Sequence, residues 1–146
     1  MLLTGFSIGG SLTWHPACQT PTDSAAYSPI ASGFWRPHPT VCARPIKMLR
    51  THGWLDSTVP LEGQPIWGGG IHQNNIFQGL KLRRAENGCY AGRPDKLSTK
   101  GCFWRRALAS CDPSTVLQMA VYAGGQGVPG ADQPWRSTGS SMSTDR

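Results

Sequence analysis

Apolar residues along this chain occur in short runs, separated by stretches rich in Gly, Pro and polar residues. Runs of this length with turn residues at both ends are typical of buried β-strands. They predict strands over residues 1–7, 25–31 and 45–51. Loops are predicted over residues 33–45, which are rich in Pro, and over residues 57–73, which are rich in Gly and Pro.

Two further segments carry the signals of helices. Residues 8–19 predict a helix that begins directly after the first strand, although its interior contains poor helix formers. Residues 74–86 predict a second helix, with Asn74 as its N-terminal cap and Asn87-Gly88 as its stop. The alternation of strands, loops and helices favours an α/β fold over an all-α or all-β fold.

One segment fits both a helix and a strand. Residues 112–123 resemble a capped helix with Pro113 at its first position. The alternation of Leu117, Met119 and Val121 suits a strand equally well. Propensity alone leaves both structures open for this segment.

Composition limits the size of the core. A chain of 146 residues is at most one domain of ordinary size. Leu, Ile, Val and Phe together make up about 18% of it, below the roughly 20% expected of a well-filled core. The 18 Gly and 12 Pro indicate extensive loops, whereas the six Trp argue against a chain that is a flexible tail along its whole length. We expect a loop-rich domain over residues 1–130 and a polar, disordered tail over residues 131–146.

The net charge of +6 does not indicate a nucleic-acid partner. Arg83-Arg84 and Arg105-Arg106 are the only adjacent basic pairs, and no nucleic-acid-binding motif accompanies them, so we interpret them as solvated surface. We expect no membrane partner, because every uncharged stretch is interrupted by Gly, Pro or amide residues. Residues 1–14 lack the basic and apolar regions of a signal peptide, which predicts a cytoplasmic protein if the chain is made as written.

The junction of the first strand and first helix carries a motif. Gly5-Phe6-Ser7-Ile8-Gly9 has the form G-x-S-x-G, which places a nucleophilic serine on a sharp strand-to-helix turn in α/β-hydrolases. Glycines on both sides let the turn close and leave the serine oxygen exposed. By itself the pattern is weak, since Ser7 could equally be an ordinary turn serine.

Three other segments strengthen this interpretation, because they occur in the order of one family. Residues 52–63 resemble the H-G-x-x-D-x-x-V-P stretch of the polyhydroxybutyrate depolymerase-like esterases, a branch of the α/β-hydrolases that includes feruloyl-esterase relatives. Asn87-Gly88-Cys89 with the later Cys111 resembles the family's N-G-C and its partner cysteine. Residues 124–129 resemble its G-G-H-G-x-P turn.

The resemblance implies roles for four residues. Ser7 corresponds to the nucleophile, Asp56 to the acid that orients a histidine, and the Ile8 amide to one oxyanion donor. The histidine position is occupied by Gln126. A neutral amide cannot take the serine proton near pH 7, and losing one triad member costs a factor of about 10⁴ to 10⁶ in turnover. We therefore expect an impaired serine esterase that acts on an ester or polyester without a metal or cofactor.

The resemblance also implies two disulfides, Cys18–Cys42 and Cys89–Cys111, which leave Cys102 unpaired. Such bridges require an oxidising compartment, and the family is typically secreted. The alternative for the first pair is a zinc site, in which His15 and His38 would join Cys18 and Cys42.

The resemblance covers only the C-terminal portion of the family's fold. It implies a mostly parallel sheet with flanking helices whose first strands, and the loop with the second oxyanion donor, would precede residue 1. The strand before Ser7 would then be an apolar sheet edge, through which the chain could self-associate. The alternative to an impaired enzyme is a non-catalytic remnant, a pseudogene product, or a module that binds polyester or a partner chain.

Other residues near this site have structural alternatives. Asp56 could cap the turn at Ser57-Thr58, and His52 is interpreted as a structural residue at a strand end. His72 is the other histidine that could act as a substitute base. Four tryptophans are interpreted mainly as packing residues, with a substrate cleft near Ser7 as the functional alternative for some of them: Trp14, Trp35, Trp54 and Trp67.

Overall fold

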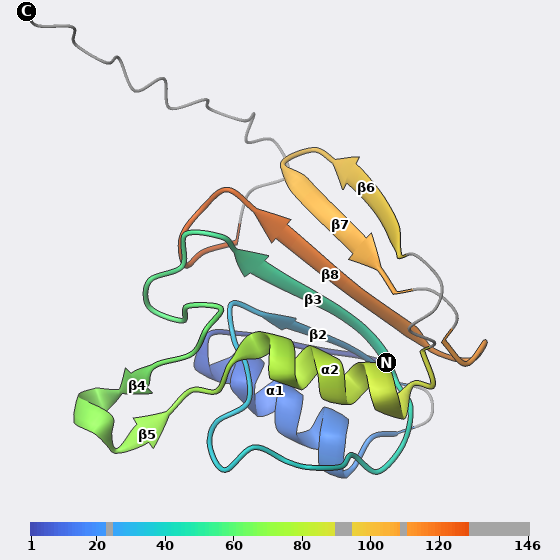
Figure 1. The fold of residues 1–146 in the computed structure, drawn as a ribbon, viewed down its shortest axis with the longest axis horizontal. Helices are drawn as coiled ribbons and strands as arrows, with labels where there is room; N and C mark the ends of the chain where they lie inside the picture. Colours follow the sequence, from blue (N-terminus) through green and yellow to red (C-terminus); the bar gives the residue numbers. More distant parts are fainter. Residues whose placement is uncertain (23–24, 90–94, 109–110, 129–146) are drawn as a thin grey trace, which may run out of the picture.

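A computed structural model of the protein describes residues 1–22, 25–89, 95–108 and 111–128. Its central element is a six-stranded sheet with the order β1-β2-β3-β8-β7-β6 (Figure 1). The strands, in that order, are Leu2–Phe6, Ala26–Ile30, Lys47–Gly53, Val116–Tyr122, Phe103–Ala107 and Lys96–Lys100. The first four run parallel, and β8, β7 and β6 pair antiparallel. The fold is therefore α/β with a mixed sheet.

Two helices pack against this sheet. Helix α1 spans Ile8–Gln19 and follows β1 after a single residue, while α2 spans Ile76–Glu86. A small β-hairpin projects from the connection between β3 and α2 (Figure 1). It consists of β4 (Pro65–Ile66), a 3₁₀ turn (Trp67–Gly69) and β5 (Ile71–His72).

The predicted strands and helices are confirmed, with corrections at two places. The strands over 1–7, 25–31 and 45–51 are β1, β2 and β3. The cap of the second helix is Asn75 rather than Asn74, because the Asn75 side chain accepts hydrogen bonds from two amides of the first helical turn. The segment 57–73 is not wholly loop, since it contains the small β4–β5 hairpin.

The segment that fitted both a helix and a strand is β8. It pairs with β3 along seven residues and with β7 on its other side. In this position Leu117 and Tyr122 are buried. The neighbouring β6–β7 hairpin was not predicted from the sequence, because neither strand alternates regularly between apolar and polar residues.

The core lies between the two helices and one face of the sheet. Its members come from α1, the three strands β2, β3 and β8, and the loops on both sides of β2: Trp14, Ala17, Cys18, Ala25, Tyr27, Phe34, Cys42, Ile46, Met48 and Leu117. The rings of Trp14 and Phe34 lie 4.8 Å apart. This cluster holds α1 against the parallel strands and so supports the turn from which α1 starts.

Arg83 joins the two helices and corrects the interpretation of the basic pairs. It is fully buried, and its guanidinium donates to the Ala17 carbonyl at 2.9 Å and to the Arg44 carbonyl at 3.3 Å. Burial lowers the pKa of Arg83 to about 10, which still leaves it charged at neutral pH. Arg83 is therefore a structural cation of the core and not part of a solvated surface.

Both expected disulfides are present. Cys18 is bonded to Cys42 and Cys89 to Cys111, while Cys102 is a free thiol. The zinc alternative is wrong for the first pair, because both of its sulfurs are in the bridge. Within the described ranges, no three His, Cys, Asp or Glu side chains are grouped so that they could hold a metal ion.

The disulfides bear on the environment of the protein, since such bonds persist in oxidising compartments. None of the helices seen in the described part of the chain is long and apolar enough to cross a membrane. The expected tail over 131–146 lies outside the described residues, and the domain boundary at 130 stays a prediction.

The second face of the sheet differs from the helix-covered face. Side chains alternate between faces along a strand, so Leu49 lies opposite to the buried Met48. A hollow of about 440 Å³ on this second face is lined in part by Leu49, Phe103 and Ala120, with the free Cys102 among its other neighbours. At one edge of the sheet lies β1, with Leu2 and Phe6 exposed.

Candidate functional site

Ser7 lies on a strained turn between β1 and α1. Its backbone has φ 54° and ψ −119°, a conformation that residues with a side chain rarely adopt. The Ser7 amide bonds the Ile30 carbonyl at 3.0 Å, and the Ser11 amide bonds the Ser7 carbonyl at 3.0 Å. One bond continues the sheet and the other begins the helix, so both elements hold the strained residue in place.

The glycines of the motif have different roles. A β-carbon on Gly5 would lie only 2.1 Å from the Gly9 carbonyl oxygen, so no side chain fits at position 5. A β-carbon on Gly9 would meet nothing within 4 Å. Gly10, the next residue, is constrained by Ser32, whose hydroxyl would be 2.3 Å from an added β-carbon. The tight strand-to-helix approach therefore depends on Gly5 and Gly10.

Ser7, Asp56 and Gln126 gather at the carboxyl ends of parallel strands. Ser7 follows β1, Asp56 follows β3, and Gln126 follows β8. In open α/β sheets, ligands bind at the carboxyl ends of the strands. The Gln126 amide nitrogen donates a hydrogen bond to Ser7 Oγ at 2.9 Å. The residue that replaces the expected histidine is thus in direct contact with the candidate nucleophile.

The loops that carry Asp56 and Gln126 are locked together. The Leu55 amide bonds the Gly124 carbonyl at 2.9 Å, and a β-carbon on Gly53 would lie 2.2 Å from the Gly125 carbonyl oxygen. The hydroxyl of Tyr122, which the sequence analysis did not single out, lies within hydrogen-bond distance of the carbonyls of Gly125 and Gly127 on either side of Gln126. These contacts fix the backbone from which the Gln126 side chain extends.

Asp56 is buried, and only one of its two carboxylate oxygens accepts hydrogen bonds. Its Oδ1 accepts hydrogen bonds from the amides of Thr58 at 3.0 Å and Val59 at 2.8 Å. The turn-capping interpretation of Asp56 is therefore confirmed. Its Oδ2 is buried without a hydrogen-bond partner and lies 3.4 Å from His52 Nε2. Burial raises the pKa of the carboxyl, although the two amides and Arg50 act in the opposite direction.

His52 is held by two neighbours in a single tautomer. Its Nε2 lies 2.7 Å from the Val59 carbonyl oxygen, which can only accept, so Nε2 carries the proton. Its Nδ1 accepts from the Arg50 guanidinium, which can only donate. Burial and the Arg50 charge lower the pKa of His52 to about 3. Both ring nitrogens are engaged, so His52 is a structural residue, as expected, and not a base for Ser7.

Arg50 is the main residue of this region that sequence reasoning missed. It is fully buried, donates to the Ser32 carbonyl at 3.1 Å, and has a pKa lowered by burial to about 9. The charges of Arg50 and Asp56 are opposite and close, so Asp56 raises the pKa of Arg50 and Arg50 lowers the pKa of Asp56. Each group thus favours the charged form of the other. The available signal was its period-two spacing with Met48 and His52, which places all three on the same buried face of β3.

His72 is not placed as a base for Ser7. Its Nδ1 lies 2.8 Å from the Gln73 carbonyl oxygen, and His72 does not line the cavity beside Ser7. The remaining histidines, His15 and His38, pack against the ring of Phe34. All four histidines of the chain are within the described residues, and none of them hydrogen-bonds Ser7.

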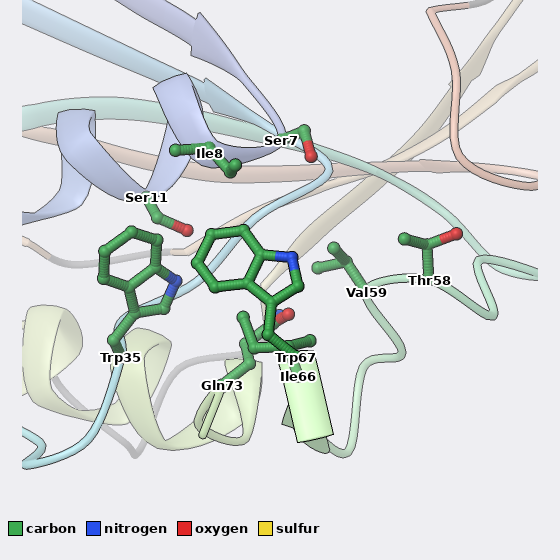
Figure 2. Close-up of a pocket in the computed structure, with 9 residues that line it drawn as sticks. All are labelled: Ser7, Ile8, Ser11, Trp35, Thr58, Val59, Ile66, Trp67 and Gln73. Atoms are coloured by element: carbon green, nitrogen blue, oxygen red, sulfur yellow. The ribbon is translucent and has the colours of Figure 1, made fainter. Parts of the chain in front are cut away.

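A small cavity of about 110 Å³ lies beside Ser7 (Figure 2). Its walls come from α1, the loop after β2, the loop after Asp56 and the β4–β5 hairpin: Ser7, Ile8, Ser11, Trp35, Thr58, Val59, Ile66, Trp67 and Gln73. Trp35 and Trp67 thus belong to a cleft near Ser7. Trp14 is in the core and Trp54 is 61% exposed outside the cavity, so neither contributes to it.

Ile8 contributes to this cavity in two ways. Its side chain is part of the wall, and as the first residue of α1 its amide has no partner within the helix. An unpaired amide directly after the serine is suited to stabilise negative charge on an oxygen bound there.

No family model matches this chain, and a search of curated proteins finds no match to its sequence. The four motif segments therefore remain a resemblance, and the function has to be argued from the site.

Proposed function

We propose that this protein carries a serine ester-hydrolase site of the α/β-hydrolase type, similar to the polyhydroxybutyrate depolymerase-like esterases, in which turnover is strongly impaired. The observation that carries the proposal is the strained conformation of Ser7, with φ 54°, at the junction of a strand and a helix. Backbone strain of this kind persists where the surrounding structure enforces it, and it occurs preferentially at functional sites.

The arrangement at the end of the sheet supports the same proposal. Because β1, β3 and β8 run parallel, Ser7, the Asp56 loop and the Gln126 turn all lie at the carboxyl ends of these strands. In the proposed reaction, Ser7 Oγ attacks the ester carbonyl, an acyl-serine forms, and the alcohol leaves with a proton; water then releases the acid. The Ile8 amide would hold the oxygen that becomes negative during the attack.

Impairment follows from the hydrogen bond between Gln126 and Ser7. The amide nitrogen donates to Oγ, so it occupies a lone pair of the nucleophile and cannot receive the hydroxyl proton. Asp56 Oδ2 lies 3.4 Å from Nε2 of His52, whose two ring nitrogens are engaged by Arg50 and the Val59 carbonyl, so Asp56 does not orient a base for Ser7. Without a base we expect turnover to be lower by a factor of about 10⁴ or more than in an enzyme with a complete triad.

The experiment restores the base. Hydrolysis of 4-nitrophenyl acetate is measured for the natural chain, for Gln126→His and for Gln126→His combined with Ser7→Ala. We expect Gln126→His to raise the rate by about 10²-fold or more, and Ser7→Ala to remove that gain. Because a free imidazole itself attacks nitrophenyl esters, Gln78→His on the exposed face of α2 is the matched control. A gain of equal size in that control, or one that survives Ser7→Ala, would contradict the proposal.

A second candidate is a non-catalytic module that binds an ester or polyester, or a partner chain. It is favoured by the engagement of both His52 nitrogens and by the contact of Gln126 with Ser7, which leave the site without an imidazole base. The two functions separate in the same experiment: binding of short esters without a Ser7-dependent gain in Gln126→His would favour the binding module. We further propose that the protein works in an oxidising compartment, which the two disulfides support.

A further inference from the structure

The cavity beside Ser7 contains one buried polar group that no protein atom satisfies. Gln73 is only 2% exposed, and its Nε2 has no hydrogen-bond partner among the described residues. A buried amide N–H without an acceptor is unfavourable, so native proteins rarely retain one without a role. Gln73 lines the same cavity as Ser7.

The backbone of Gln73 is held on two sides. Its amide bonds the Gln64 carbonyl at 2.9 Å, and its main chain forms a bridge with Trp35. The next residue is fixed as well, through a 2.8 Å bond from the Asn74 amide to the Phe34 carbonyl. The position of the Gln73 side chain is therefore set by its surroundings rather than by a mobile loop.

Figure 2 shows Ser7 above the indole of Trp67 and Gln73 below it, with the indole of Trp35 to the left; all four residues line the cavity. The cavity is small, with a volume of about 110 Å³. A ligand anchored at Ser7 would thus extend only a short group toward Gln73, between largely apolar walls.

We propose that Gln73 is a specificity-determining residue, whose Nε2 donates a hydrogen bond to an acceptor oxygen in the acyl group of an ester bound at Ser7. The substrate class is then short acyl esters that carry an ether or ketone oxygen beyond the ester carbonyl. This inference rests on the proposed ester site. It follows from general recognition chemistry, because a site built to bond a substrate oxygen disfavours the analogue without it by leaving its own polar group unpaired.

The experiment uses two esters that differ by a single replacement of CH₂ by oxygen. Dissociation constants of methyl methoxyacetate and methyl butanoate are measured for the full chain from the change in tryptophan fluorescence, since Trp35 and Trp67 line the cavity. We expect methyl methoxyacetate to bind about five- to tenfold more tightly. Equal binding, or tighter binding of methyl butanoate, would overturn the inference.

Variants assign any preference to the proposed donor. Gln73→Met keeps the length of the side chain and removes the donor, so the preference should disappear or reverse. Gln78→Met makes the same chemical change at an exposed position of α2 and should leave the preference intact. If Gln73→Met fails to fold, the comparison of the two esters on the natural chain still decides whether the site prefers the ester with the additional oxygen. Loss of preference in both variants would overturn the role of Gln73.

Failure of this inference is distinguishable from failure of the ester site. If both esters bind equally and Gln126→His acquires Ser7-dependent hydrolysis, the ester site stands and only the role of Gln73 is overturned. If neither ester binds, the inference is overturned. Without Ser7-dependent hydrolysis in Gln126→His, the proposed esterase function fails as well.

Discussion

The Gln126 amide nitrogen lies 2.9 Å from Ser7 Oγ, although the two residues are separated by 119 positions in the chain. The contact requires that the carboxyl ends of β1 and β8 lie on the same side of the sheet and that Tyr122 holds the turn after β8. It brings the candidate nucleophile into contact with a donor where a hydrolase needs an acceptor.

The first prediction concerns the pH dependence of Gln126→His. An imidazole accepts a proton only when neutral, so the Ser7-dependent rate should rise with pH through the ordinary histidine range near 6.5 and then level off. The natural chain has no such base at Ser7 and should show no inflection there. Rates of nitrophenyl ester hydrolysis between pH 5 and pH 8 test this. An identical inflection in the natural chain would mean that another histidine acts on Ser7.

The second prediction separates the two glycines of the motif. Gly5→Ala should destabilise the protein by about 3 kcal/mol, because its β-carbon would overlap the backbone at Gly9. Gly9→Ala is the matched control, since it adds a methyl group in open space within α1 and should stabilise the helix by up to about 1 kcal/mol. Urea unfolding of both variants gives the comparison. Similar stability of the two would contradict the tight turn.

The third prediction concerns the buried His52. Its pKa is about 3 in the folded protein and about 6.5 in the unfolded chain, so the unfolded chain binds the extra proton below pH 6.5. Stability should therefore fall as the pH is lowered from 6.5 toward 3, by at most about 1.4 kcal/mol per pH unit from this residue. Asp56, with its raised pKa, acts in the opposite direction and reduces the net slope.

Replacement of His52 tests this assignment. Unfolding free energies of the natural chain and of His52→Gln are compared at pH 5 and pH 7. His52→Gln lowers stability at pH 7, where Arg50 and the Val59 carbonyl lose their partner, but its stability should depend less on pH. An unchanged pH dependence would show that His52 is not the group that titrates on unfolding.

The fourth prediction concerns the disulfide between Cys18 and Cys42. The bridge joins residues 24 positions apart, and closing a loop of that size stabilises by about 3 kcal/mol in the chain-entropy account. Replacing both cysteines by Ala should lower the unfolding free energy by about that amount. Cys102→Ser, which removes a free thiol, should change stability much less. Equal losses would mean that the bridge contributes little to stability.

Local features of the fold were predictable from sequence because they depend on near neighbours. The run before Ser7, the glycine at position 5 and the change from strand to helix lie within ten residues, and together they predicted the strained turn. The boundary of α2 was missed by one residue. Asn74 and Asn75 are both good caps in sequence, and only the folded backbone places the Asn75 oxygen near two free amides.

Other features depended on pairing between distant segments. Residues 116–122 fit a helix or a strand until β3 on one side and β7 on the other provide partners for their backbone. The β6–β7 hairpin has no regular apolar alternation to predict it, and it joins the sheet through the pairing of β7 with β8. Arg50 shows the same limit, since an arginine within a strand indicates exposure unless distant groups such as the Ser32 carbonyl and Asp56 surround it.

The sequence by itself determined a serine on a strand-to-helix turn, and through the resemblance it predicted a distant aspartate and a glutamine as the other members of the site. Tertiary structure alone decided the contact of Gln126 with Ser7, the buried pair of Asp56 and His52, and the cavity that Ser7 and Gln73 both line. The physical reason is the separation along the chain over which each effect acts. Steric limits on a turn act between adjacent residues, whereas hydrogen-bond satisfaction and cavity shape depend on every segment that the sheet brings together.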